Sequence, residues 1–392
     1  MQRVVLERGL PVIKHALVVI AIVAGLVTAA KPAHAYPQFQ LARDATCSGC
    51  HVNPAGGGLL NENGMAAAEA MSQFGDPPEF MYNKIPLPSW LELGGELRNI
   101  AGYFKSPQDY LALFPMQADV YAAATFKAFQ IHVTVGYRPP EYGNEAATYV
   151  WSREHYLQWQ SDAGSNEGLF IRAGRFMPVF GLRLAEHVDY TRQYGGTPLY
   201  GETYGAAVEY VKEGYEAHLT GFVHDPLIDP VNHDNGAAAY VEWRPTKHAA
   251  IGAEGLVGVS KDEKTYRGGL TGKYYFASPD VLVQAEVQLA NHVLDAGGAP
   301  TTLVGYLLAS HWFSSSIMLD IGLGHYDEDI RVRNLERDCI DLNLHWFMLS
   351  HLELILNNRV ELFAFGRTNG NPTEPSGGPT GGWSLLQLHY RL

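Results

Sequence analysis

The stretch Cys47-Ser48-Gly49-Cys50-His51 carries the clearest chemistry in the chain. Two thiols at this spacing can each form a thioether with a haem vinyl group, and the adjacent histidine can place its imidazole beneath the iron. Cys47, Cys50 and His51 are therefore predicted to hold one covalent haem c, with His51 as the proximal iron ligand. The alternatives are a thiol redox pair or half of a zinc site. A zinc site needs further ligands, and only Cys339 remains.

The second axial ligand of such a haem has several candidates. Met65 and Met71 lie in an alanine-rich stretch that predicts a helix ending at Gly75. The stretch Arg172 to Arg183, which includes Met177, continues through Glu186, His187, Asp189, Tyr190, Arg192 and Tyr194 in a long predicted loop, residues 178–202. We expect this loop to fold inward, narrow the pore and contact the haem segment, with His187 as a candidate axial ligand or iron contact. The remaining alternatives are an open distal position, and methionines that merely pack against the haem or the barrel wall.

The amino end predicts export. Arg3, Arg8 and Lys14 precede an apolar run and the small-residue site Ala33-His34-Ala35, as in a secretory signal peptide over residues 1–35. A retained membrane anchor is the alternative. Export fits the haem, which is attached outside the cytoplasm. With 3 cysteines, no disulfide framework holds the fold.

The charge of the chain narrows its partners. The formal net charge of −13 does not suit nucleic acid, whose phosphates attract basic proteins, and it favours cations. The sequence also contains no Ser-His-Asp arrangement and no phosphate-binding glycine loop that would indicate a hydrolase or a kinase.

The remaining sequence predicts a membrane-spanning sheet. No apolar run after the signal is long enough for a membrane helix, so insertion must use strands. The 41 glycines, 22 tyrosines and 18% charged residues suit a barrel with aromatic girdles. Residues 282–289 alternate strictly, with Val283, Ala285 and Val287 on one face and Gln284 and Glu286 on the other. A soluble β-sandwich or propeller is the alternative.

Counting such runs predicts an all-β fold, a transmembrane antiparallel β-barrel of about sixteen strands. Linkers after even-numbered strands are mostly tight and those after odd-numbered strands mostly longer, which predicts periplasmic turns, outer loops and periplasmic termini. Strand two is expected to start near Pro115. Strand four does not sort into two faces, because Arg153 and His155 share a parity with Trp151 and Trp159. Strand twelve, near Thr301, also lacks a clear polar face.

Parity assigns a set of polar residues to the lumen. They are Glu92, Glu96, Arg98, Asp119, His132, Glu209, His218, Glu254, Glu286, His292, Asp320, Asp341, His345, Glu353, Arg359, Glu361 and His389. Most such residues solvate a pore and pair with one another. Two groups of residues on predicted outer loops could bind Fe(II): Asp225, Asp229, His233 and Asp234 in one, and Asp327 to Asp329 in the other. The alternative is that these acids are simply solvated by water.

The chain thus divides into a signal peptide (1–35), a monohaem cytochrome c segment (36–80), a linker (81–89) and an outer-membrane β-barrel (90–392). The short haem segment is expected to plug or cap the barrel, since without the porphyrin it cannot bury a core.

This organisation resembles the fused monohaem cytochrome-porins of bacterial outer membranes. Phe39 and Arg43 precede the haem motif as in that family, and Pro54 and the Leu60-Asn61-Glu62-Asn63-Gly64 element follow it. The chain departs from the pattern by inserting residues 55–59 between them and by ending in Leu392. The match covers about thirty residues in detail and the rest by architecture.

The resemblance implies one haem c in or under the barrel and electron exchange across the outer membrane. The barrel would contact membrane lipid, a periplasmic c-type cytochrome or other carrier would be the partner, and extracellular Fe(II) is a candidate donor. The alternatives are a diffusion porin with a haem-binding plug or sensor, and a haem peroxidase, which needs a distal acid–base residue that the motif does not supply.

Overall fold

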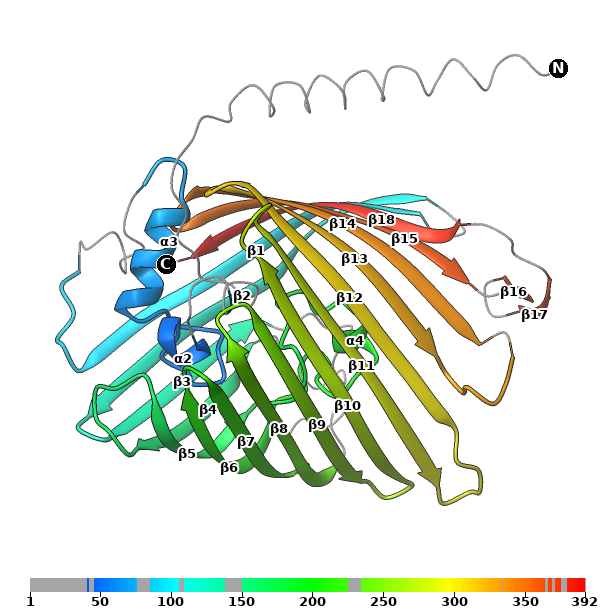
Figure 1. Cartoon of the computed structure of the whole chain (residues 1–392), viewed down its shortest axis with the longest axis horizontal. Helices are drawn as coiled ribbons and strands as arrows, with labels where there is room; N and C mark the ends of the chain where they lie inside the picture. Colours follow the sequence, from blue (N-terminus) through cyan, green and yellow to red (C-terminus); the bar gives the residue numbers. More distant parts are fainter. Residues whose placement is uncertain are drawn as a thin grey trace, which may run out of the picture.

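The chain folds into a closed barrel of sixteen antiparallel strands (Figure 1). This computed structural model describes residues 41, 46–75, 85–105, 109–137, 150–224, 234–333, 335–363, 366–368, 371–374 and 379–391. The predicted fold class is confirmed. The predicted signal peptide, together with Phe39 and Arg43, lies outside the described residues. Among those described, no helix is long and apolar enough to cross a bilayer.

Each barrel strand pairs with its neighbours in sequence, and β18 closes the barrel between β15 and β1. The strands are β1 (Leu91–Lys105), β2 (Tyr110–Phe126), β3 (Phe129–Tyr137), β4 (Val150–Gln160), β5 (Gly168–Phe176), β6 (Thr203–Lys212), β7 (Tyr215–Val223), β8 (Asn235–Thr246), β9 (Ala249–Val259), β10 (Glu263–Phe276), β11 (Val281–Leu294), β12 (Thr301–Ser314), β13 (Ile317–Asp327), β14 (Glu336–Leu349), β15 (Leu352–Phe363) and β18 (Pro379–Arg391). A separate hairpin joins β16 (Gly366–Thr368) and β17 (Asn371–Glu374). The helices are α2 (Cys47–Cys50), α3 (Glu62–Met71) and α4 (Tyr190–Gln193).

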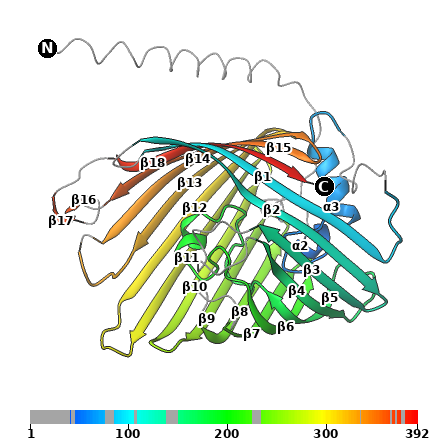
Figure 2. The same ribbon diagram turned by 180° about the vertical axis from the view of Figure 1, so that it is seen from behind.

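The two ends of the barrel differ. Connections after even-numbered strands are mostly tight, as between β6 and β7, and most connections after odd-numbered strands are longer, as between β5 and β6. We call these the tight-turn end and the long-loop end. The carboxyl end of the chain and α3 lie at the tight-turn end (Figure 1, Figure 2). The predicted asymmetry of the linkers is confirmed.

The two faces of the sheet follow the predicted parity. Glu209, His218 and Asp341 are almost fully buried in the lumen, whereas Leu219 and Ile251 are more than half exposed on the outer face. So many apolar side chains around the outside would be unfavourable in water and suit contact with lipid. The barrel therefore has the surface of a membrane-spanning protein.

A β-bulge explains why strand four does not sort into two faces. Between β3 and β4 the register shifts, so that Arg153 is an extra residue without a partner on β3. Such a bulge reverses parity within one strand. Trp151 consequently lies in the lumen, 4.7 Å from the guanidinium of Arg175, while Leu157 beyond the bulge is exposed on the outer face.

β2 begins at Tyr110, so the predicted start near Pro115 is wrong. The strand continues through the proline because a second bulge follows it, in which Met116 has no partner on β1. Proline lacks an N–H and is tolerated in a strand at such an irregularity.

The long loop after β5 folds into the barrel. Its Leu182, Leu184 and Tyr190 form a buried cluster with Val304 and Tyr306 of β12. This contact accounts for strand twelve, whose inner face is apolar because it packs against the loop rather than against water. We call residues 177–202 the inward loop.

Candidate functional site

Two short helices present the Cys-x-x-Cys-His residues. The Thr46 side chain caps α2 by accepting a hydrogen bond from Gly49 N at 3.1 Å. Asn61 caps α3 in the same way, accepting from Gly64 N at 3.0 Å. Polar caps of this kind satisfy N–H groups that a helix start leaves free, so each helix begins where the sequence supplies one.

The Leu-Asn-x-x-Gly element locks the two helices together. Asn61 Nδ2 donates to the carbonyl of Ser48 at 2.9 Å, and Asn61 N donates to Cys50 O at 3.0 Å. Gly64 faces the same carbonyl so closely that a Cβ there would lie 2.1 Å from Cys50 O. A glycine at this position is therefore required for α3 to approach the second cysteine.

The inserted glycine run lines one wall beside the cysteines. Gly56, Gly57 and Gly58 have φ angles of +89°, +79° and +64°, a region that residues with a side chain rarely adopt. A Cβ on Gly56 would lie 3.4 Å from Cys47 Sγ. The run keeps the space beside this thiol free of side chains, as a flat ligand attached there would need.

Buried arginines of the barrel hold this loop from the other side. Arg172 Nη1 donates to Asn53 Oδ1 at 3.1 Å and pairs with Glu209 at 2.7 Å. Arg183 of the inward loop donates to Ala55 O at 3.2 Å and pairs with Glu216.

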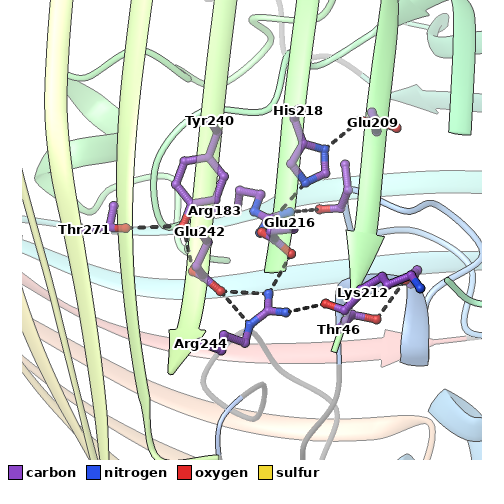
Figure 3. A network of polar contacts seen from close by, with 12 residues as sticks. Thr46, Arg183, Glu209, Lys212, Glu216, His218, Tyr240, Glu242, Arg244 and Thr271 are labelled. Carbon is purple, nitrogen blue, oxygen red and sulfur yellow. Dashed lines mark hydrogen bonds and ion pairs between the residues drawn. The ribbon is translucent and has the colours of Figure 1, made fainter. Parts of the chain in front are cut away.

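Glu216 belongs to a network on the lumen wall (Figure 3). Its carboxylate also accepts from Arg244 at 2.7 Å, and Arg244 in turn pairs with Glu242 at 2.7 Å. Because these charges are buried, each depends on its partner for compensation. The network fixes the haem-motif loop to the barrel through Arg183.

The residues that follow α3 attach the cysteine-bearing segment, residues 46–75, to the rim of the barrel. Gln73 N and Phe74 N donate to the carbonyls of Phe347 and Met348, at 2.9 and 3.1 Å, where β14 ends. On α2, Ser48 Oγ donates to Asn166 O in the turn between β4 and β5, at 2.5 Å. The segment therefore occupies the barrel mouth at its tight-turn end, as a plug would.

Cys47, Cys50 and His51 line a cavity of about 340 Å³ inside the barrel. This volume falls in the range of small-molecule and cofactor sites, ~300–1,000 Å³. Burial, assisted by Arg391, lowers the pKa of His51 to about 4, so its imidazole is neutral and can ligate a metal. The donor set, the cavity and the glycine wall all fit a haem c.

The inward loop also borders this cavity. His187, the predicted histidine candidate, lines it together with Met177. Burial and the nearby arginines, Arg192 first among them, lower the pKa of His187 to about 3, which leaves it neutral. Met116, pushed inward by the bulge of β2, also lines the cavity. All three are chemically able to serve as a second axial ligand.

The two predicted methionines lie elsewhere. Met65 lines a separate cavity of about 300 Å³ between the segment and β1. Met71 is buried in an apolar cluster with Leu282, Trp312 and Phe347. Neither borders the space that Cys47, Cys50 and His51 share, so their position favours a packing role.

Sequence reasoning missed Met116, and it named Met177 and Arg192 only as members of the stretch expected to contact the haem segment, without a role of their own; all three line this cavity. The stretch Arg172–Arg183 carried a signal, because it leads into the long loop. The conformation of the loop decides which of its residues line the cavity, and the spacing of these residues in the sequence does not predict that conformation.

The loop acids do not form a metal site in the part of the chain that is described, where no group of three or more His, Cys, Asp or Glu residues could hold an ion. Asp329 instead pairs with Arg331 at 2.9 Å. Asp225, Asp229 and His233 lie outside the described residues.

Comparison with known proteins identifies the barrel type. No family model and no curated protein matches the chain. Among solved structures it is similar to OmpT of Vibrio cholerae (11% identity, TM-score 0.58, covering 79% of this chain and 100% of the other). It is also similar to the anion-selective porin of Comamonas acidovorans (13%, 0.57, 77% and 98%) and to OmpF of Salmonella typhi (10%, 0.58, 77% and 97%). At these identities the likeness shows a shared fold: the barrel is of the kind found in outer-membrane porins.

Proposed function

We propose that the protein transfers electrons across the outer membrane through one covalently bound haem c inside a porin-type barrel. The observation that supports this most directly is that Cys47, Cys50 and His51 line one cavity in the lumen. The sixteen-stranded barrel, similar to those of porins, supports its location in the outer membrane.

The roles of the residues follow from the geometry. Cys47 and Cys50 would tether the porphyrin and His51 would ligate its iron, while Gly56 to Gly58 leave room beside it. A bound haem supplies one-electron chemistry. An apolar band about 25 Å tall blocks electrons without such a carrier, and the barrel insulates the haem from lipid.

Partners would meet the two ends of the barrel. We assign the tight-turn end to the periplasm, where a c-type cytochrome or another carrier would exchange electrons. The long-loop end then faces outward to an extracellular donor or acceptor, with Fe(II) a candidate donor.

A diffusion porin whose haem segment is only a plug or sensor is the second candidate, because ordinary porins share this barrel. The two functions differ in what crosses the membrane. A conduit passes electrons while conducting few ions, whereas a porin conducts ions.

The test is electron transfer into proteoliposomes. Wild-type protein should be coloured and should reduce or oxidise a soluble c-type cytochrome sealed inside the vesicles when an impermeant redox agent is added outside. Cys47→Ser/Cys50→Ser should lose both colour and electron transfer, and Cys339→Ser should keep both, because Cys339 is buried in another cluster. Colourless wild-type protein, or equal rates in all three, would refute the proposal.

A further inference from the structure

One arginine of the cavity differs from the others. Arg98, Arg153, Arg183, Arg192 and Arg391 all line it. Four of them have a carboxylate partner: Arg153 pairs with Asp119 at 2.6 Å, Arg183 with Glu216, and Arg98 and Arg391 each lie 3.7 Å from Glu96.

Among the residues that the structure describes, Arg192 hydrogen-bonds only to the backbone of its own loop. Its Nε donates to Thr197 O at 2.9 Å and its Nη1 to Leu184 O at 2.7 Å. Within the described ranges no carboxylate lies within ion-pair distance of its guanidinium. Burial lowers the pKa of Arg192, and the more distant carboxylates of Asp189 and Glu202 only partly offset this. A half-buried cation whose counter-charges all lie beyond ion-pair distance is incompletely compensated. The loop therefore holds a guanidinium in place for an anion that enters the cavity.

The placement of the helices indicates which anion. α2, which carries the cysteines, and α4, which carries Arg192, lie at separate positions along the lumen in both views (Figure 1, Figure 2). In a haem c the two vinyl carbons bind the cysteines, and the two propionates extend from the opposite edge of the porphyrin. A haem attached to α2 would direct its carboxylates away from α2, into the cavity that Arg192 borders.

We propose that Arg192 binds a propionate carboxylate of the haem and so fixes the porphyrin between α2 and the inward loop. This inference rests on the proposed function. Arginine suits the role because its planar guanidinium donates paired hydrogen bonds to a carboxylate. Thr197, which also lines the cavity, lies beside it on the same loop.

The assignment has an electrostatic consequence for the iron. A fixed positive charge near the porphyrin favours the ferrous state, whose iron carries one positive charge less. Removing the charge should therefore favour the ferric state.

The experiment is a redox titration of detergent-purified, haem-loaded protein with resonance Raman spectra. In Arg192→Gln the ferrous-to-ferric ratio at a fixed ambient potential should fall about tenfold, which is 59 mV for a one-electron couple. The propionate bending bands should shift. Arg192→Lys should restore much of the ratio because it keeps the charge. Unchanged mobility shifts on boiling will verify that each variant folds.

The matched control is Arg267→Gln. Arg267 is also a lumen arginine that bonds to the inward loop, at Tyr194 O (3.3 Å), but it does not line the cavity. Arg267→Gln should leave the propionate bending bands unchanged and should leave the ferrous-to-ferric ratio close to that of the wild type.

Three outcomes would overturn the inference. Coloured Arg192→Gln protein with unmoved bands and ratio refutes it alone and leaves the proposed function standing. A wild-type ratio that responds to added acetate, with constant propionate bands, would assign Arg192 to a free carboxylate instead. Colourless wild-type protein refutes the proposed function and this inference together.

Discussion

Single residues decide whether the haem motif can be built at all. Asn61 donates two of the bonds that join α2 to α3 and caps α3 with a third, and Gly64 permits the contact of the two helices. The Leu-Asn-x-x-Gly element was identified from the sequence by resemblance alone. Its physical basis is the close approach of α3 to the carbonyl of Cys50.

Gly64→Ala should loosen this segment. The added Cβ meets a backbone oxygen, which cannot rotate away as a side chain would. Overpacking of this kind costs about 1–3 kcal/mol. Limited proteolysis should cut residues 46–75 faster than in the wild type, and the haem-to-protein absorbance ratio should fall. Gly221→Ala, whose Cβ would meet nothing within 4 Å, is the control. Equal resistance of both variants would contradict this account.

At this scale the sequence predicts that Cys47, Cys50 and His51 act together, and it does not predict the cavity that they line. Cys47, Cys50 and His51 are adjacent in the chain, so their spacing alone predicts that they act together. His187 was found because a histidine in a long loop is conspicuous. Met177 and Arg192 were marked only as parts of the same stretch, because their individual positions at the cavity depend on the path of the inward loop.

At the scale of elements, irregular strands shape the cavity. The bulges in β2 and β4 turn Met116 and Arg153 into the lumen, and both residues line the same cavity. β-Bulges commonly redirect a side chain next to a functional site. Strict alternation cannot detect them, which is why the sequence misplaced the start of β2 and left β4 unsorted.

The inward loop should control how firmly the plug is seated. Arg183→Gln removes a donor to Ala55 O and an ion pair with Glu216. Breaking a buried pair costs about 3–5 kcal/mol, and here the loss falls at the lower end because Arg244 still neutralises Glu216. Single-channel recordings in planar bilayers should give a larger ion conductance than the wild type.

The control for this change is Arg331→Gln. Arg331 forms an exposed pair with Asp329, and such pairs contribute little to stability. Its conductance should match the wild type. A wild-type conductance in Arg183→Gln as well would mean that the inward loop does not hold the plug.

The whole molecule was the part best predicted from sequence. The alternation of polar and apolar residues, the asymmetry of the linker lengths and the absence of long apolar runs each favour a β-barrel independently. Errors in the bounds of β2 or in the faces of β4 do not change the prediction that the sheet closes into a barrel. The contacts among the haem-motif segment, the inward loop and the barrel strands join residues far apart in the chain, such as Asn53 and Arg172. The periodicity of the sequence cannot predict such contacts.

The barrel's dependence on lipid can be tested by charge placement. Leu219 is the central residue of β7 and is exposed outward, while Tyr215 begins that strand at the tight-turn end. Leu219→Arg should destabilise the barrel by about 2–4 kcal/mol, and Tyr215→Arg by about 0–1 kcal/mol, since the cost of charge falls toward the interface. Guanidinium titrations in lipid vesicles measure both. Equal costs would contradict a membrane-spanning β7.

The position of the plug also bears on the order of biogenesis. The segment touches the turn after β4 and the end of β14, so strands from distant parts of the chain surround it in the finished barrel. A maturation enzyme would have no access to thiols enclosed in this way. The thioethers proposed for Cys47 and Cys50 would therefore have to form before the strands assemble, and the barrel would then close around a segment that already carries its haem.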